Sequence, residues 1–139
     1  MSTIRREVVV GRDRVAVFDY VADVSRHCEW NRDLLRTEMV APGPVGVGTR
    51  GVEVRRMMGR EMRSPFVITR HEPPERQDFH TTGGPVRPDG VLRCEVDGAG
   101  TRVSYELTLH GPLAPVMAVM IGRGVQRDLA ALKHMLEQD

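Results

Sequence analysis

The segment GTRVSYELTLHGPLAPVMAVMIGRGVQRDLAALKHMLE, residues 100–137, joins two different periodicities across Gly111-Pro112. Before this break, apolar and polar residues alternate, which predicts a half-buried strand with one face formed by Val103, Tyr105, Leu107 and Leu109. After the break, apolar residues recur at helical spacing, which predicts one long helix over Leu113–Glu137. At about 1.5 Å per residue this helix is ~37 Å long, enough to cover one face of an antiparallel sheet.

The chain before this segment is predicted to supply the rest of the sheet. A strand over Ile4–Val10 is followed by a short helix that Asp13 caps and by a second helical turn over Asp23–Trp30. Strands are then expected over Leu34–Val40, from Thr49 to a turn at Met58-Gly59-Arg60, and over 62–69, 77–82 and 92–96. The prediction is an α+β fold in which a curved antiparallel sheet of about six to seven strands wraps around the C-terminal helix.

The composition of the chain argues against several classes of function. The chain has 139 residues, 20 basic against 19 acidic side chains and a net charge of +1, which predicts one domain over residues 1–139 and no nucleic-acid partner. Neither an integral membrane segment nor a signal peptide is expected, and the cytoplasm is the predicted location. Lys133 is the sole lysine, and this excess of arginine is interpreted as a sign of a GC-rich bacterial genome.

Several segments carry a family resemblance. Residues 17–31, VFDYVADVSRHCEWN, resemble the opening of the START-like, or Bet v 1-like (SRPBCC), superfamily, with Val17, Asp23 and Trp30 in the characteristic places. The polyketide cyclase/dehydrase branch is the most similar. Further resemblance lies in PVGVGTR (44–50), ITRHEPPERQDFHTTGG (68–84), GAGTRVSYEL (98–107) and LAALKHMLE (129–137).

The resemblance implies a helix-grip fold with a cavity between the sheet and the long helix. Members of the superfamily bind apolar or amphipathic molecules there, so a polyketide, lipid or quinone-like ligand is expected. Some members cyclise or dehydrate polyketides, so an aromatase/cyclase or dehydratase is the alternative function. No cofactor is expected.

Strand alternation and the expected cavity select the candidate ligand-binding residues. They are Trp30, Val54, Met62, Ser64, Phe66, Phe79, Cys94, Tyr105, Val116 and Met120. Trp30 either forms a wall of the cavity or fixes the short helices to the sheet. Cys94 is also interpreted as a small buried apolar residue.

Two residues are weak candidates for catalysis, Tyr105 and Arg56. The Tyr105 hydroxyl either points into the cavity or bonds to a backbone carbonyl in the core. Arg56 either binds a ligand carboxylate or carbonyl, or is solvated at the hairpin. No nucleophile motif is present, and the histidines and cysteines lack metal-ligand spacing, so no metal is predicted.

Two further features of the sequence call for a structural explanation. Gly122 and Gly124 lie inside the predicted helix, where each costs ~1 kcal/mol relative to alanine, which suggests close approach to the sheet or a ligand, or a kink. Pro65 lies inside a predicted strand, which favours an edge position or a bulge.

The exposed apolar residues of Leu113–Ile121 are an alternative protein-binding surface, including one for a homodimer.

Overall fold

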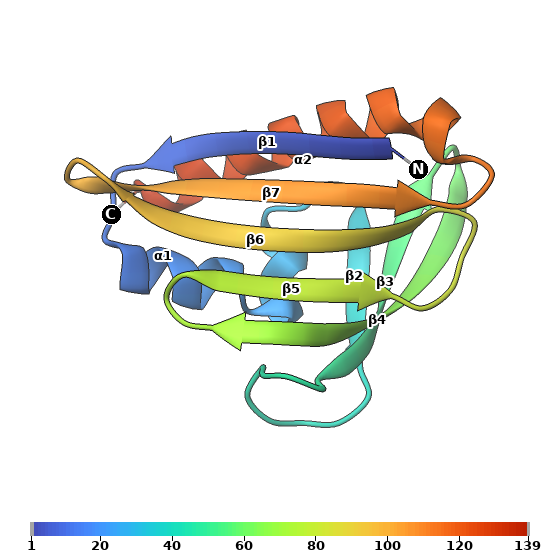
Figure 1. Ribbon diagram of the computed structural model, residues 1–139, viewed down its shortest axis with the longest axis horizontal. Coiled ribbons are helices and arrows are strands. Elements are labelled where there is room, and N and C mark those ends of the chain that lie inside the picture. The colour runs from blue at the N-terminus through green and yellow to red at the C-terminus, as the bar shows by residue number, and fades with distance from the viewer. Residues whose placement is uncertain (1, 139) are drawn as a thin grey trace.

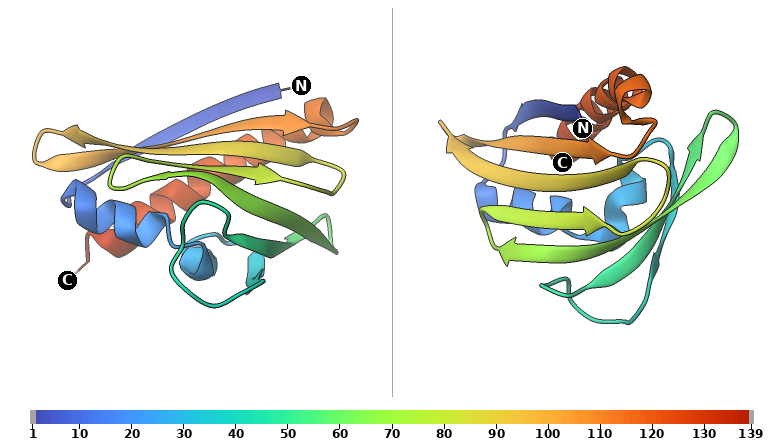
Figure 2. Two further views of the ribbon diagram at one scale, coloured as in Figure 1. Left: turned by 60° about the horizontal axis from the view of Figure 1, so that its bottom comes forward. Right: turned by 45° about the vertical axis from the view of Figure 1, so that its right-hand side comes forward.

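The computed structural model describes residues 2–138 and has the predicted α+β architecture. Seven antiparallel strands form one curved sheet in the order β1-β7-β6-β5-β4-β3-β2, and the long helix α2 lies across its concave side (Figures 1 and 2). The elements are β1 (Ser2–Val10), α1 (Arg14–Val21), the 3₁₀ helix η1 (Val24–Glu29), β2 (Leu34–Met39), β3 (Arg50–Met57), β4 (Arg60–Glu72), β5 (Arg76–Thr81), β6 (Arg87–Asp97), β7 (Gly100–His110) and α2 (Ala114–Leu136).

The two short helices begin where the sequence predicts. The carboxylate of Asp13 accepts a hydrogen bond from the Ala16 backbone N–H, and Asp23 accepts one from the Ser25 N–H. These bonds satisfy amide groups that the first turn of each helix leaves free. The caps therefore fix the chain reversal that brings η1 to the side of the sheet near β2.

Packing between α2 and the sheet divides into two regions. The second half of α2 and the helix α1 enclose one buried cluster, which contains Val10, Val17, Phe18, Val21, Trp30, Leu92, Cys94, Val103, Leu129 and Leu132. The first half of α2 joins a second cluster, which contains Ile4, Val86, Leu107, Leu109, Ala114 and Met117. Each fully buried side chain of this size contributes about 1.5–3 kcal/mol, so both ends of α2 are held firmly against the sheet.

The two helix glycines have different surroundings. A Cβ atom on Gly122 would lie 2.8 Å from Nη2 of Arg6 and 3.4 Å from Cγ2 of Ile4, so α2 passes close to β1 at this point. A Cβ atom on Gly124 would meet only the Arg127 guanidinium, at 3.8 Å. Gly122 therefore permits the close contact between helix and sheet that the sequence suggested, whereas Gly124 leaves space open.

Pro65 lies in β4, which is an interior strand of the sheet. Its ladder with β5 ends at the pair Phe66–Thr81, and the Pro65 carbonyl accepts a hydrogen bond from Thr82 just beyond it. In an antiparallel strand the N and C=O of one residue point to the same side. An N–H group at position 65 would therefore point past the end of β5. Pro65 thus occupies a local edge of the sheet, although β4 is an interior strand.

Among the helices in residues 2–138, none combines the length and the apolar character needed to span a bilayer.

Candidate functional site

A cavity of about 390 Å³ lies between the sheet and α2. Its size is within the range of small-molecule sites. Most of its wall is apolar and comes from β3, β4, β5, β6, β7 and α2, with the side chains of Met57, Met62, Phe66, Phe79, Val86, Pro88, Leu107, Leu109, Ile121 and Val125. Gly124 also lines it, which explains why the space beside this glycine is open.

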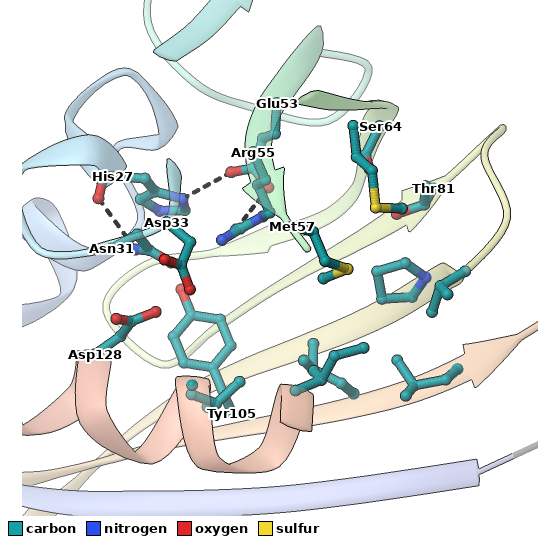
Figure 3. Close-up of a pocket in the computed structure, with 18 of the residues that line it drawn as sticks. His27, Asn31, Asp33, Glu53, Arg55, Met57, Ser64, Thr81, Tyr105 and Asp128 are labelled. Carbon is teal, nitrogen blue, oxygen red and sulfur yellow. Dashed lines mark hydrogen bonds and ion pairs between the residues drawn. The ribbon is translucent and has the colours of Figure 1, made fainter. Parts of the chain in front are cut away.

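Polar side chains gather at one end of the cavity, next to η1 and the second half of α2. Figure 3 shows them facing one another from four elements and the loop after η1. They are His27, Asn31, Asp33, Glu53, Arg55, Tyr105 and Asp128. Away from this end the wall also contains the hydroxyl groups of Ser64 and Thr81 but is mostly apolar (Figure 3). The cavity therefore has a largely apolar body and a polar end, in the way that an amphipathic ligand requires.

Glu53 is the centre of this polar end. Arg55 donates a hydrogen bond from Nη2 to Oε1 of Glu53 at 3.0 Å, and Nδ1 of His27 lies 3.3 Å from the other carboxylate oxygen. Burial alone would raise the pKa of the Glu53 carboxyl, but the charges of Arg55 and His27 outweigh burial and lower it to about 2. Glu53 is thus an ionised carboxylate held between Arg55 and His27.

The His27 ring is fixed between two oxygen atoms. Nε2 of His27 lies 2.8 Å from the Val21 carbonyl oxygen, which can only accept, so Nε2 donates its hydrogen there. Nδ1 lies 3.3 Å from Oε2 of Glu53. His27 therefore ties the backbone of α1 to the carboxylate at the polar end of the cavity.

Asp128 is a carboxyl group on the buried side of α2. Its side chain accepts a hydrogen bond from the Arg32 backbone N–H at 3.2 Å and lies 3.6 Å from Nε of Arg127. Burial raises the pKa of Asp128, although the Arg32 hydrogen bond and the charge of Arg127 oppose this. Asp128 is a candidate proton acceptor or donor at the polar end of the cavity.

Tyr105 and Trp30 form the aromatic part of the same region. Their ring centroids are 6.1 Å apart, and Trp30 also meets the His27 ring edge-on at 5.3 Å. The Tyr105 hydroxyl points toward the polar end (Figure 3) and has no hydrogen-bond partner among residues 2–138. Burial and the charge of Glu53 raise the pKa of Tyr105, so its hydroxyl keeps its proton and can donate it in a hydrogen bond.

The cavity includes most of the residues that the sequence selects. Trp30, which is 5% exposed, both packs in the core and contributes to the wall, so its two interpretations are compatible. The other selected residues that line the cavity are Met62, Ser64, Phe66, Phe79, Tyr105 and Met120. Val54, Cys94 and Val116 lie outside the lining: Cys94 is part of the core under α1, and Val116 is 76% exposed on α2.

The position of Val54 follows from the register of β3. Residues directly opposite in an antiparallel pair share a face, and the cavity residues Ser64 and Met62 of β4 lie opposite Glu53 and Arg55. Val54 lies opposite Arg63 and therefore faces outward. The face that the sequence predicted for β3 is thus wrong by one residue.

Because the inward face of β3 differs by one residue from the prediction, Arg55 and not Arg56 is the arginine of the polar end. Arg56 is exposed near the end of β3 and reaches the lining only at the opening of the cavity. Arg55 contacts Glu53 and directs its guanidinium into the cavity (Figure 3). A carbonyl or hydroxyl of a ligand would meet N–H donors of Arg55 at this place.

The structure shows no metal-ligand cluster of His, Cys, Asp or Glu among residues 2–138. Two histidines instead share one acid on the outer face of the sheet. Nδ1 of His80 lies 2.6 Å from Oδ1 of Asp89, and Nε2 of His110 lies 3.2 Å from Oδ2. These contacts link β5, β6 and β7 away from the cavity.

The sequence of residues 1–137 matches a family model described as polyketide cyclase / dehydrase and lipid transport. The chain belongs to this family. The match spans every element that forms the cavity, and it confirms the resemblance found in the sequence. Comparison with curated protein sequences gives no significant match.

Solved structures show the same fold at low sequence identity. A START superfamily protein from Mycobacterium smegmatis has a TM-score of 0.83 and 13% identity, with 98% of this chain and 97% of that chain covered. The protein TTHA0849 from Thermus thermophilus has a TM-score of 0.81 and 20% identity, with 97% of each chain covered. The Zhui aromatase/cyclase from Streptomyces sp. R1128 has a TM-score of 0.79 and 13% identity, with 98% of this chain and 93% of that chain covered. This family member is therefore a helix-grip protein.

Proposed function

We propose that this protein binds a small amphipathic molecule whose apolar body fills the cavity and whose polar group lies beside Arg55 and Tyr105. The observation that carries the proposal is the segregation of the cavity wall into an apolar body and one polar end. Fixed polar groups orient a ligand in such a site, and the apolar wall supplies most of the affinity. A polyketide, a quinone or a lipid satisfies this description.

The charges at the polar end favour a neutral ligand group. Arg55 forms an ion pair with Glu53 at 3.0 Å, and Arg127 forms one with Asp33 at 2.9 Å. Asp128 also lies 3.6 Å from Arg127, so both of these arginines already have acidic partners. Because Arg55 and the Tyr105 hydroxyl both donate hydrogen bonds, a carbonyl oxygen is the ligand group that fits best.

Gly124 provides a test of ligand binding. Gly124→Leu adds a branched side chain to the cavity and also improves helix propensity, so we expect the fold to keep its stability. The probe is Prodan, a neutral naphthyl ketone whose fluorescence reports an apolar environment. We expect the Kd of Prodan to rise about tenfold or more in Gly124→Leu, because the leucine overpacks the site.

The control is Gln126→Leu, which adds the same side chain to an exposed position of α2. It should bind Prodan as the unmodified protein does. Equal affinity for Prodan in Gly124→Leu and in the unmodified protein would show that the probe binds outside the cavity. The proposal would be contradicted if the unmodified protein neither bound Prodan nor carried any molecule in native mass spectrometry.

A second candidate function is an aromatase/cyclase or dehydratase, because Arg55, Tyr105 and Asp128 converge on the same end of the cavity. In a cyclisation, the Asp128 carboxylate would take a proton from the carbon beside a ketone, and Arg55 and Tyr105 would donate hydrogen bonds to the enolate oxygen. The new carbon–carbon bond forms when the enolate carbon attacks a second carbonyl, whose oxygen takes up the proton from Asp128. In a dehydration, Asp128 would then take the second proton from the same carbon and return it to that hydroxyl, which leaves as water while a carbon–carbon double bond forms.

We expect Tyr105→Phe to lower turnover of a linear poly-β-ketone thioester about a hundredfold while the fold stays intact. Tyr20→Phe is the matched control, because the Tyr20 hydroxyl bonds to Glu29 outside the cavity. Product formation is followed by chromatography. Turnover by the unmodified protein at the rate in buffer alone would leave ligand binding as the function, and unchanged turnover in Tyr105→Phe would remove this hydroxyl from the reaction.

A further inference from the structure

The hairpin between β3 and β4 presents an unusual side chain at its tip. Met58 is 80% exposed and has a φ angle of 53°, a left-handed conformation that no other non-glycine residue described in the chain adopts. Asparagine, aspartate or glycine normally occupies such a position, because other side chains are strained there. An exposed methionine here is unfavourable both for the backbone and for solvation, which points to a role outside the isolated fold.

The first half of α2 exposes apolar side chains on the opposite side of the cavity opening. Val116 and Val119 are 76% and 64% exposed. Met58 and Met120 both line the cavity while remaining exposed, so the opening lies between the hairpin tip and α2. Figure 2 (right) shows the light-green hairpin and the start of the orange helix on the same side of the molecule.

Arginines without acidic partners accompany these apolar residues. Arg56 and Arg60 flank Met58, and Arg123 follows Val119 by one helical turn. Among residues 2–138 none of these three forms an ion pair, whereas Arg36 and Arg63 of the same sheet both contact Glu38. Glu61 lies opposite Arg56 in the hairpin but forms its ion pair with Arg36, so the arginines of the opening keep their charge unpaired although the whole chain has a net charge of only +1.

We propose that this surface docks on an anionic lipid bilayer. We call it the opening surface and define it by Arg56, Met58 and Arg60 on the hairpin and by Val116, Val119 and Arg123 on α2. Apolar side chains enter the boundary between headgroups and acyl chains, while arginines bind the phosphates. The cavity opens within this surface, so an apolar ligand passes between bilayer and cavity without crossing water. Docking itself requires no ligand and goes beyond the proposed binding function.

A second copy of the chain fits this surface less well. In a twofold dimer the same surface faces itself, so the unpaired arginines would lie opposite arginines. An acidic protein would match the charge, but the exposed apolar residues are divided between a hairpin tip and a separate helix. A fluid bilayer accommodates both elements.

Vesicle flotation tests the proposal with the ligand-free protein. We expect the protein to float with vesicles of phosphatidylcholine and phosphatidylglycerol in equal parts, and about tenfold less with phosphatidylcholine alone or at high salt. Met58→Asn should reduce flotation about tenfold and at the same time raise the thermal midpoint, because asparagine tolerates the left-handed backbone. A merely structural role for Met58 would not produce these opposite effects.

Two pairs of variants make the test specific. Val116→Gln and Arg123→Glu should each lower flotation several-fold, whereas Val96→Gln and Arg93→Glu should leave it unchanged. Val96 and Arg93 are exposed on β6, outside the opening surface. Equal flotation with both vesicle types, equal loss in the control variants, or a stable dimer that Val116→Gln dissociates would overturn the proposal.

Discussion

Glu53→Ala is expected to lower the free energy of unfolding by about 3 kcal/mol. The carboxylate of Glu53 is the shared partner of Arg55 and His27, and both of these side chains are largely removed from solvent. Without the Glu53 carboxylate, the Arg55 guanidinium and the His27 ring lose their shared partner in a region that water reaches poorly. Removing one member of a buried ionic group costs more than the group contributes as a whole, because the other members stay desolvated.

Glu38→Ala is the control for this effect. The Glu38 carboxylate also bridges two arginines, Arg36 and Arg63, and its pKa is likewise lowered to about 2, chiefly by the Arg63 hydrogen bond. The Glu38 side chain is 41% exposed, however, against 17% for Glu53, so its loss should change stability far less than the loss of Glu53. Urea unfolding of both variants at neutral pH measures the difference. Equal losses would mean that burial of Glu53 has no energetic consequence.

Acid should destabilise this protein through the same residue. The pKa of Glu53 is about 2 in the folded protein against an ordinary value of 4.5, so folding favours the ionised form. Its contribution is fully present above the unfolded pKa and is lost as the pH falls from about 4.5 to about 2. At about 1.4 kcal/mol for each pH unit between the two pKa values, the loss amounts to about 3 kcal/mol.

Glu53→Gln isolates this contribution, because glutamine keeps the hydrogen-bonding shape but does not titrate. The free energy of unfolding of the unmodified protein should fall more steeply below pH ~4.5 than that of the variant. Glu38 titrates in both proteins and cancels in the difference. Parallel pH profiles for the two proteins would refute the assignment of the acid transition to Glu53.

The fold could be predicted from the sequence because local patterns and long-range packing agree. The period-two pattern of β7 and the helical stripe of α2 each identify one element and the face that it buries. Asp13 and Asp23 mark the beginnings of the short helices by a side-chain hydrogen bond that depends only on nearby residues. Such signals depend little on distant parts of the chain.

The face of β3 could not be predicted in this way. Its alternation places Val52 and Val54 on one side and Glu53 and Arg55 on the other, and apolar residues are normally expected to face inward. In this protein β3 lies at the polar end of the cavity, so its charged face with Glu53 and Arg55 is the one that faces inward. Val54 lies in register between Arg36 and Arg63, whose ion pairs with Glu38 keep it buried on the outer face.

The acidic residues of the cavity were also not predicted from the sequence. Asp128 interrupts the apolar stripe of α2 between Val125 and Leu132, and a lone carboxyl group on a buried helix face is a recognisable signal of a functional group. His27 and Glu53 are 26 residues apart and meet only after η1 packs beside the sheet. No spacing rule within one element connects them.

The pairing of the first strand with the last has a consequence for synthesis of the protein. Ser2 of β1 lies opposite Leu109 of β7, and β1 forms one edge of the sheet. On the ribosome, the nascent chain therefore holds an unpaired, partly apolar β1 until β7 has emerged, and α2 arrives later still. Closing such a long loop costs conformational entropy before any contact compensates for it, so native structure forms late and the waiting segments are natural clients for chaperones.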